Sequence, residues 1–226
     1  MKKLIISIVS FLYSVYFLTK NNIITKSSRF YYLRLKCQEG NIFCVEHSEL
    51  SKAEVFVNGK NNCIKIKGAE VSNSFISISG DNNELILDVS SKLRASKIHL
   101  RGSNCKIKIG KGTTFGGIRI VNVGRNNDIL IGEDCLFADN IELWASDTHS
   151  ILNEQGEKIN CEEPIIIEDR VWIGSHAKIL KGVTIGHDSV VGMGSIVTKD
   201  IYPNTLNIGT PNKVIKEGIS WKNDYL

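Results

Sequence analysis

The sequence lacks the features that mark a disulfide-rich, metal-binding or membrane-spanning chain. Its six cysteines form no CxxC pair and show no metal-ligand spacing, and they lie at Cys37, Cys44, Cys63, Cys105, Cys135 and Cys161. We interpret them as small apolar residues in a reducing compartment. The longest apolar run, 4–18, spans fifteen positions. A helix of that length reaches ~22 Å, so a full span of the ~30 Å bilayer core is not expected.

Acidic residues are absent from positions 1–36, which carry seven Lys and Arg residues. The other 21 basic residues and all 24 acidic residues lie in 37–226, so that part has a formal charge of −3. MKK before an apolar run resembles a secretion signal, but no small-x-small cleavage site follows it. Two interpretations of 1–36 stay open: a helix in the headgroup region of an anionic membrane, or a helix that caps one end of the main domain.

A motif of glycine, asparagine and alternating apolar residues recurs four times. It reads GKNNCIKI (59–66), GDNNELIL (80–87), GSNCKIKI (102–109) and GRNNDILI (124–131), so the glycines recur at nearly constant intervals. Gly and Asn tolerate positive φ, and a short alternating run precedes each glycine, so each unit is predicted to be strand, turn and strand. Repeats of this length predict stacked coils, an all-β solenoid with one core.

After about residue 131 the apolar period shortens to six. The positions in step are Ile131, Phe137, Leu143, Ile167, Ile173, Ile179, Ile185, Val191 and Val197. Three such hexads are predicted to make one triangular coil with its apolar side chains inward. The register is unbroken between Leu143 and Ile167, although 144–166 carry none of these positions.

The C-terminal part resembles the hexapeptide-repeat acyltransferases. The resemblance rests on VWIG (171–174), KGVTIG (181–186), VVGMGSIVTKDI (190–201) and GTPNKVIK (209–216), in the family's order and spacing. It implies a left-handed parallel β-helix, an exception to the right-handed crossover rule, and a homotrimer with its active sites between subunits. It is close over 131–216, whereas 41–130 agrees only in being a β-solenoid.

The domain boundaries expected from these patterns are a basic, apolar N-terminal segment at 1–40, a β-helix acyltransferase domain at 41–214 and a C-terminal tail at 215–226. Within the domain, the resemblance identifies 144–166 as an extruded active-site loop. It implies that His149 is the general base for acetyl transfer from acetyl-CoA to a sugar hydroxyl, a task for which imidazole is suited at neutral pH. The oxyanion is expected to meet a backbone N–H that the sequence does not identify.

Further site residues follow from the resemblance. Asp147 either orients the ring of His149 or contacts the sugar, with an ordinary turn aspartate as the alternative. Trp144 stacks on a sugar or packs structurally. The coenzyme residues carried over position by position are Trp172, Ser175, Met193, Thr198, Lys199 and Lys213, with Lys216 as a weaker candidate. Met193 departs from the small residue usual in VVGxGS.

The segment SDTHSI (146–151) and the closing ISW (219–221) resemble enzymes that O-acetylate bacterial surface polysaccharides, such as capsular polysialic acid and O-antigen. We therefore expect a glycan acceptor and a cytoplasmic enzyme, with 1–36 in contact with the inner face of the plasma membrane as an option. No nucleic-acid partner and no metal are expected.

Three alternatives are weighed against this function. An N-acyltransferase of a nucleotide-linked amino sugar would share the fold and coenzyme. A β-helix carbonic anhydrase would need three zinc-binding histidines, and the spacing of His149, His176 and His187 does not match that family's pattern. A non-catalytic scaffold is disfavoured because VWIG and the histidine loop occur together.

Overall fold

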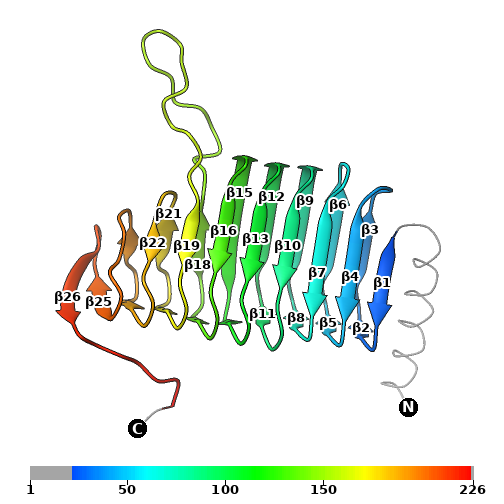
Figure 1. Ribbon diagram of the computed structural model, residues 1–226, viewed down its shortest axis with the longest axis horizontal. Coiled ribbons are helices and arrows are strands. Elements are labelled where there is room, and N and C mark those ends of the chain that lie inside the picture. Colours follow the sequence, from blue (N-terminus) through cyan, green and yellow to red (C-terminus); the bar gives the residue numbers. More distant parts are fainter. Residues whose placement is uncertain (1–21, 225–226) are drawn as a thin grey trace.

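The computed structural model describes residues 22–224, which form a parallel β-helix of three sheets (Figure 1). The first sheet contains β1 (Ile23–Lys26), β4 (Ile42–Glu46), β7 (Cys63–Lys67), β10 (Glu84–Leu87), β13 (Lys106–Ile109), β16 (Asp128–Ile131), β19 (Ile165–Ile167) and β22 (Thr184–Ile185). The second contains β2 (Arg29–Tyr31), β5 (Glu49–Ser51), β8 (Glu70–Ser72), β11 (Lys92–Arg94), β14 (Thr114–Phe115), β17 (Leu136–Phe137), β20 (Trp172–Ile173), β23 (Val190–Val191), β25 (Thr205–Ile208) and β26 (Lys213–Glu217). The third contains β3 (Arg34–Cys37), β6 (Glu54–Asn58), β9 (Phe75–Asp81), β12 (Lys97–Ser103), β15 (Ile118–Arg125), β18 (Ile141–Trp144), β21 (Lys178–Leu180) and β24 (Ile196–Val197).

Apolar side chains from all three sheets point into the solenoid and stack coil on coil. The hexad positions from Ile131 to Val197 are all buried, which confirms the triangular coil. Ile167 and Ile185, three hexads apart in sequence, lie side by side on β19 and β22. In the N-terminal half the paired positions are farther apart in sequence, as with Ile109 of β13 and Ile131 of β16. The predicted strand–turn–strand units are confirmed there.

The Gly-Asn turns lie at the edge between the third and first sheets. Gly80 has φ +107°, and a Cβ there would lie 1.9 Å from the carbonyl oxygen of Gly102 on the next coil, so only glycine fits this stack. Next to these glycines, buried asparagine side chains of successive coils are hydrogen-bonded to one another in a ladder. Asn62 Nδ2 donates to Asn41 Oδ1, and Asn83 Nδ2 donates to Asn62 Oδ1, both at 2.9 Å. The ladder pairs polar groups that would otherwise be buried alone.

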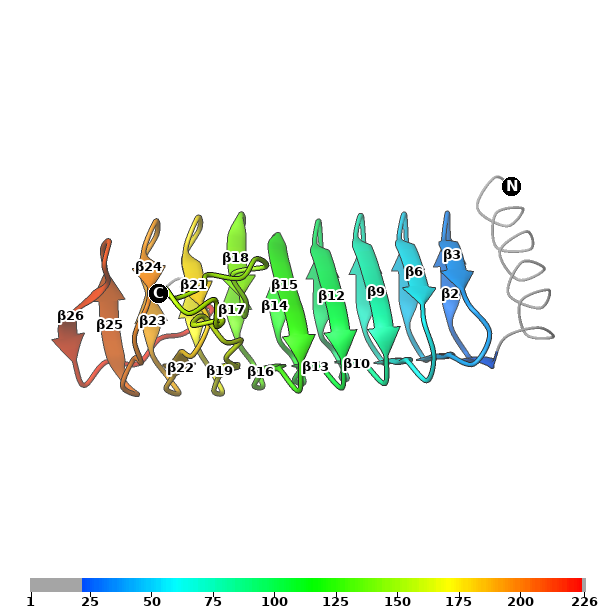
Figure 2. The same cartoon turned by 90° about the horizontal axis from the view of Figure 1, so that it is seen from above.

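The long loop of residues 145–164 leaves the solenoid at this same third–first edge, after β18 and before β19 (Figures 1 and 2). Ile131 of β16 pairs with Ile167 of β19, which is six hexads further along the chain. This separation equals two coils of three hexads each, so the loop adds the length of one coil without changing the register. The extruded loop predicted for this stretch is thereby confirmed.

Among the described residues the solenoid already includes β1 from Ile23, which pairs with β4, so it extends N-terminal to residue 41, the boundary expected from the sequence. Ile23 and Leu35 face the core, whereas Arg34 points outward and pairs with Glu54 of the next coil at 3.4 Å. The basic residues of this stretch thus lie on the outer surface of the coil. They alternate with inward-facing apolar residues, and because basic residues are so frequent here the sequence did not indicate a strand.

The two ends of the chain differ in what the structure describes. The apolar run 4–18 lies within 1–21, outside the described residues, so both interpretations of it stay predictions. In the part from 22 to 224 no helix has the length and hydropathy that a membrane crossing requires. At the C-terminal end β26 pairs antiparallel with β25, so the tail expected from 215 begins inside a strand, and 218–224 run back along the solenoid (Figure 1).

The six cysteines are free thiols, as the sequence predicts. Cys135 packs in the core, and burial raises the pKa of its thiol to about 11. Such a thiol is a poor nucleophile. Cys161 is exposed and lies in the loop.

Candidate active site

A lysine from the next coil holds the base of the loop. Lys181 directly follows β21, and its ammonium group donates to Asp147 Oδ2 at 2.5 Å and to the carbonyl oxygen of Cys161 at 2.9 Å. These acceptors lie on the outgoing and returning arms of the loop. The ammonium group lowers the pKa of the Asp147 carboxyl. One cation therefore ties both arms to the solenoid.

Asn160 links this base to His149. Its Nδ2 donates to Asp147 Oδ2 at 2.8 Å and to the carbonyl oxygen of His149 at 2.9 Å, and its Oδ1 accepts from the N–H of Ile151 at 2.7 Å. The N–H of His149 donates to the carbonyl oxygen of Asp147 at 2.7 Å. The backbone of His149 is thus held on both sides while its side chain is exposed. An exposed imidazole on a tethered loop is accessible as a proton acceptor.

Asp147 has different partners from those the sequence suggested. Its Oδ2 is shared by Lys181 and Asn160, and the imidazole of His149 accepts or donates no hydrogen bond within residues 22–224. The carboxylate therefore orients the loop rather than the ring. Sequence reasoning missed Lys181 and Asn160, which lie 34 and 13 residues from Asp147. KGVTIG contains Lys181, but the motif does not indicate where that side chain points.

Trp144 ends β18 at the root of the loop. Its indole N–H donates to Glu142 Oε2 at 2.7 Å, and the guanidinium group of Arg119 lies 4.9 Å from its ring centroid. Glu142 also pairs with Lys178 at 3.6 Å. The hydrogen bond between Trp144 and Glu142 lies within β18, whereas the contacts with Arg119 and Lys178 join neighbouring coils. Contact between Trp144 and a sugar stays a prediction.

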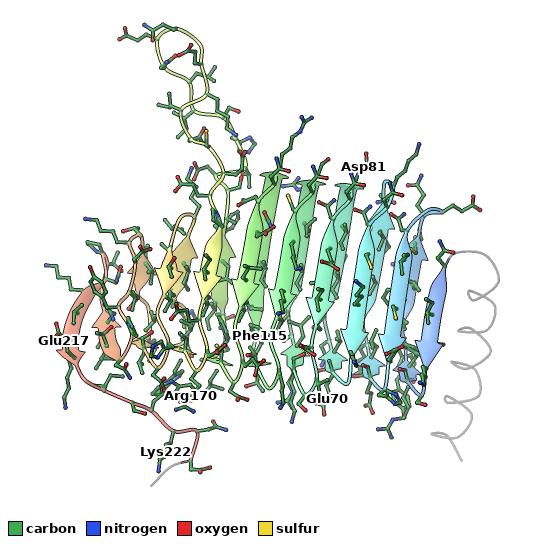
Figure 3. The ribbon with its side chains drawn as sticks, viewed as in Figure 1. Glu70, Asp81, Phe115, Arg170, Glu217 and Lys222 are labelled. Carbon is green, nitrogen blue, oxygen red and sulfur yellow. The ribbon has the colours of Figure 1, made fainter. Side chains whose placement is uncertain are left out.

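Trp172 lies on β20 in the second sheet, the face opposite the edge that carries the loop. Figure 3 shows Arg170 of the same coil on that side of the solenoid. The Trp172 side chain is 39% exposed, and its ring centroid lies 6.1 Å from that of Trp221. The indole N–H of Trp221 donates to the carbonyl oxygen of Arg170 at 2.6 Å. Sequence reasoning used ISW only as a subfamily signature and missed this tryptophan pair.

Ser175 and Met193 lie on adjacent coils at the edge between the second and third sheets, close to Trp172 in the chain. The N–H of Gly194 donates to the carbonyl oxygen of Ser175 at 2.9 Å. Met193 is 71% exposed. Ser175 Oγ donates to Asp139 Oδ1 at 2.5 Å, and this hydrogen bond lowers the pKa of Asp139. The structure therefore brings these two predicted coenzyme residues together.

The remaining predicted coenzyme residues lie elsewhere. Thr198 and Lys199 follow β24 at the third–first edge, the edge that carries the loop, whereas Lys213 and Lys216 lie on β26. All four are exposed. One chain thus spreads the predicted coenzyme residues over two edges and the end of the second sheet, and does not gather them in one pocket.

His149, the predicted base, and Trp172, a predicted coenzyme residue, do not meet within one chain. His149 extends from the third–first edge, and Trp172 lies on the opposite face. The other two histidines of the carbonic anhydrase alternative are also apart, with His176 at the second–third edge and His187 at the first–second edge. A single described chain therefore offers no three-histidine zinc set.

A basic cluster lies on the outer face of the third sheet, near Trp144. His99 of β12 is half-buried in this face. Burial lowers the pKa of His99, and so do the charges of Arg119, Arg101 and Lys97 around it. Between residues 22 and 224 these three cations form no ion pair. The cluster is thus free to attract an anion.

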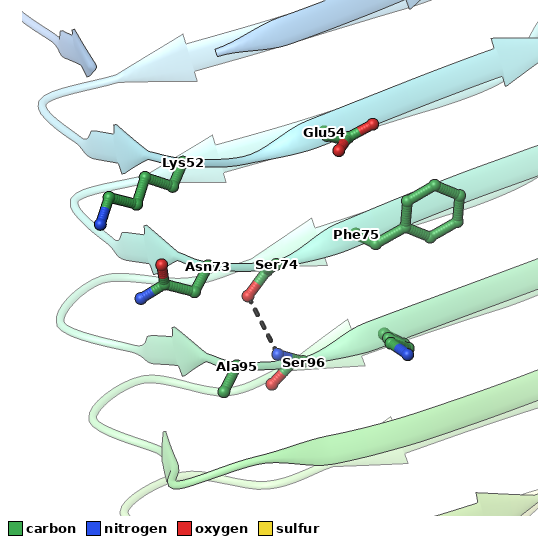
Figure 4. Close-up of a pocket in the computed structure, with 8 residues that line it drawn as sticks. Lys52, Glu54, Asn73, Ser74, Phe75, Ala95 and Ser96 are labelled. Carbon is green, nitrogen blue, oxygen red and sulfur yellow. Dashed lines mark hydrogen bonds between the residues drawn. The ribbon is translucent and has the colours of Figure 1, made fainter. Parts of the chain in front are cut away.

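Aromatic rings continue this face towards the N-terminus. The ring of Phe75 lies 5.5 Å from that of His99 and 5.6 Å from that of Phe56, centroid to centroid. Beside Phe75 an open groove of about 240 Å³, whose lining includes Asn73 and Lys97, lies at the second–third edge (Figure 4). Cations and aromatic faces therefore lie side by side on the third sheet.

Comparison with known proteins agrees with this architecture. Residues 164–199 match the family described as "Hexapeptide repeat of succinyl-transferase". Over 91 residues the chain is 47% identical to the galactoside O-acetyltransferase of Escherichia coli K12, covering 39% of this chain and 44% of the relative. Over 133 residues it is 37% identical to the polysialic acid O-acetyltransferase of Escherichia coli O1:K1, covering 58% and 42%. The matched segments thus span less than half the length of these two relatives.

Two further comparisons extend over more of the relative. The polysialic acid O-acetyltransferase of Neisseria meningitidis is 32% identical over 147 residues, which cover 55% of this chain and 68% of that protein. The crystal structure of the polySia-specific acetyltransferase NeuO superimposes with a TM-score of 0.72 at 30% identity, covering 91% of this chain and 89% of that chain. The hexad register, the extruded histidine loop and these similarities together show that the chain belongs to the hexapeptide-repeat acetyltransferase family.

Proposed function

We propose that this protein is an acetyl-CoA-dependent O-acetyltransferase that modifies a hydroxyl group of a bacterial cell-surface glycan. The observation that carries the proposal is the exposed imidazole of His149 on a tethered loop that leaves a hexapeptide β-helix. The relatives named galactoside and polysialic acid O-acetyltransferases support both the reaction and the class of acceptor.

In the proposed reaction His149 removes the proton of the sugar hydroxyl as its oxygen attacks the thioester carbonyl of acetyl-CoA. The carbon–oxygen bond forms, the carbon–sulfur bond breaks, and the protonated imidazole returns the proton to the leaving thiolate. The transfer is direct, so it requires no serine or cysteine nucleophile. A mechanism without a metal ion remains a prediction.

The coenzyme is proposed to lie against the exposed ring of Trp172, which excludes water from the thioester, and beside Ser175. The exposed Met193 stands where the family usually has a small residue, and it is proposed either to narrow this groove or to alter its backbone contacts. Exposed lysines are suited to meet the coenzyme phosphates as point charges. They are Lys199, Lys213 and Lys216. The resemblance assigns Thr198 to coenzyme binding too, but Thr198 and Lys199 lie at the third–first edge, so they would reach a coenzyme beside Trp172 only from a neighbouring copy.

The active site is proposed to form between subunits of a homotrimer. His149 and Trp172 lie on opposite sides of one chain, so a second copy has to supply one of them if both act on the same thioester. Closed cyclic symmetry gives three equivalent sites of this kind.

The acceptor is proposed to be an acidic glycan. The cluster of Lys97, Arg101 and Arg119 has no ion-pair partner in the described chain and adjoins Trp144 at the root of the loop. Cations suit carboxylates, and neighbouring aromatic rings suit the apolar faces of sugars. Sugars of a polymer that crosses this face would lie next to His149.

A cytoplasmic location at the inner face of the plasma membrane is proposed for the full chain. Because Ile23–Lys26 form a strand that pairs with the next coil, a truncation that tests membrane contact has to spare them and remove residues 1–21 only. If this segment is an anchor, its removal releases the protein from anionic vesicles, and raised salt weakens binding of the full chain. If it is a cap, its removal causes aggregation with or without lipid.

The proposed activity is tested by incubating the purified protein with acetyl-CoA and a panel of surface glycans while free thiol is followed. We expect thiol release with an acidic polysaccharide, and a product whose acetyl group is lost in mild base because it is an ester. A base-stable product would instead identify the N-acyltransferase alternative. Absence of transfer to every glycan would contradict the proposal.

A further inference from the structure

The ammonium group of Lys181 occupies a position that no other cation in the described loop region duplicates. It lies under the loop, with only 19% of its side chain exposed, and contacts one acceptor on each arm. Lys158 also carries a positive charge near the base, but it pairs with Glu162 on the returning arm, so it joins residues of the loop to each other. Lys181 alone of these two joins the loop to the following coil.

The neighbouring glycine shows how closely the loop rests on this coil. Gly182 has φ +75°, and a Cβ there would lie 2.4 Å from Glu163 Oε2 on the returning arm. The N–H of Gly182 donates to the carbonyl oxygen of Pro164 at 2.9 Å. Lys181 and Gly182 together form the surface on which the loop rests, called the seat below. Lys181 contributes its positive charge, and Gly182, which has no side chain, lets Glu163 approach closely.

From this seat two short paths lead to His149. Lys181 fixes the Asp147 carboxylate, and the carbonyl of Asp147 accepts the N–H of His149. The same carboxylate oxygen accepts from Asn160, whose Nδ2 also donates to the carbonyl oxygen of His149. The N–H and the carbonyl of His149 are therefore bonded to Asp147 and Asn160, and both of these residues meet at the carboxylate oxygen that Lys181 contacts.

We propose that Lys181 is a positioning residue for the transfer reaction, which it serves by fixing the backbone of His149 through Asp147 and Asn160. This inference rests on the proposed function, because it takes His149 as the base. A displaced base costs rate even when binding is intact, since general-base catalysis needs the imidazole within hydrogen-bonding distance of the acceptor hydroxyl.

The experiment compares Lys181→Met with a matched variant, Lys65→Met, which breaks an ion pair of the same kind with Glu84 (3.0 Å) on the remote N-terminal half. We expect Lys181→Met to lower kcat by about 10- to 100-fold with KM for acetyl-CoA within about twofold of wild type. Lys65→Met is expected to leave both unchanged. Equal kcat in Lys181→Met and wild type would overturn the inference, as would a loss of coenzyme affinity in proportion to the loss of rate.

A readout independent of activity is hydrogen exchange of the loop. The N–H groups of His149 and Ile151 are hydrogen-bonded to Asp147 and Asn160, so Lys181→Met is expected to accelerate their exchange without changing exchange in β18. Unchanged exchange in the loop would contradict the positioning role even if the rate fell.

A double-mutant cycle tests the path itself. If Lys181 acts through Asp147, the Lys181→Met/Asp147→Asn double variant is expected to be no slower than the slower single variant. Additive losses would overturn this path. His149→Ala measured in parallel separates the two proposals: full activity of His149→Ala would refute the assigned base, whereas its inactivity together with full activity of Lys181→Met would refute the positioning role alone.

Discussion

The solenoid stacks its coils differently in its two halves. The N-terminal half runs from β1 to β16, and the C-terminal half runs from β17 onward. In the N-terminal half the coils are longer than three hexads, and a ladder of buried asparagines closes one edge. In the C-terminal half the coils shorten to three hexads, as between Ile167 and Ile185, and the same edge carries the loop. The predicted catalytic and coenzyme residues all lie in the C-terminal half.

At the boundary between the halves, the hydrogen bonds of the buried asparagines change where the loop leaves the solenoid. The amide ladder stops at Asn83, whose Oδ1 accepts the N–H of Cys105 at 3.1 Å. Two coils after Asn83, Asn127 donates from Nδ2 to the carbonyl oxygen of Ala145 at 2.8 Å, so it bonds to the first residue of the loop instead of to another asparagine. The Oδ1 atoms of Asn127 and the inward-facing Asn122 are buried without a partner in the described chain. Regular stacking thus gives the fold its stability, and the departure from it lies where the loop emerges.

The largest effect is expected for His149→Ala. This substitution removes the proposed general base from the C-terminal half and leaves the stacking of its coils unchanged. We expect kcat to fall by about 10²–10⁴, the usual contribution of a general base, with little change in affinity for coenzyme A. Turnover and calorimetry on one preparation measure both quantities. Undiminished turnover would remove His149 from the mechanism.

The next effect concerns the glycines of the two halves. Gly80→Ala places a Cβ 1.9 Å from a backbone oxygen of the next coil, whereas at Gly194, also at positive φ, no atom lies within 4 Å of an added Cβ. We expect Gly80→Ala to cost more than ~3 kcal/mol of unfolding free energy and Gly194→Ala about 1 kcal/mol, the strain of the left-handed conformation. Chemical denaturation measures the difference. Equal losses would show that the N-terminal stack is not tightly constrained.

Acceptor binding tests whether the N-terminal half contributes to function. Lys97→Gln with Arg101→Gln removes two cations of the basic cluster, and Lys108→Gln with Lys111→Gln removes the same charge from another side of the solenoid. We expect the first pair to raise KM for an acidic glycan by about 3- to 10-fold, as screened surface charges do, and the second pair to leave it unchanged. The effect should vanish at high salt. Equal KM values for the two double variants would remove the cluster from the acceptor site.

A smaller and opposite effect is expected at the boundary. Asn122 lies in register with Leu100 of the preceding coil, and its Oδ1 is buried without a partner in the region described. Asn122→Leu removes this unpaired oxygen together with the hydrogen bond from Nδ2 to the carbonyl oxygen of Asn127 at 2.8 Å. It is expected to raise the unfolding free energy by less than ~1 kcal/mol, because an unpaired buried polar atom costs more than one hydrogen bond contributes net. Leu100→Asn serves as the reverse control and is expected to destabilise. A less stable Asn122→Leu variant would show that the hydrogen bond to Asn127 contributes more than the unpaired oxygen costs.

The sequence predicts the parts of the molecule that repeat. Each coil carries inward-facing apolar residues at the same positions, as Ile167 and Ile185 illustrate, so the periodicity alone predicts that they are buried. The gap in the hexads predicts where the loop leaves the solenoid. Contacts made once are not encoded in this way. Lys181 meets Asp147, and Trp221 meets Trp172, only because the chain folds distant segments onto one edge or face, and no local pattern predicts either contact.

The smallest effect is the pH dependence of the Lys181–Asp147 pair. The pKa of Asp147 is lowered in the fold, so the pair contributes fully above the ordinary aspartate pKa of about 3.9 and is lost as pH falls through the lower folded value. The carboxylate is 42% exposed, so we expect less than ~1 kcal/mol. The stability difference between wild type and Asp147→Asn should shrink below pH ~4. A difference independent of pH would exclude the ion pair as its source.

The most direct test of a site completed by two copies of the C-terminal half is complementation. His149→Ala and Trp172→Ala subunits are each expected to be inactive alone. Unfolded together and reassembled, they form mixed trimers in which some sites combine His149 of one subunit with Trp172 of another, and we predict that acetyl transfer returns in these mixtures. Mixed trimers that assemble without recovering activity would contradict the shared site.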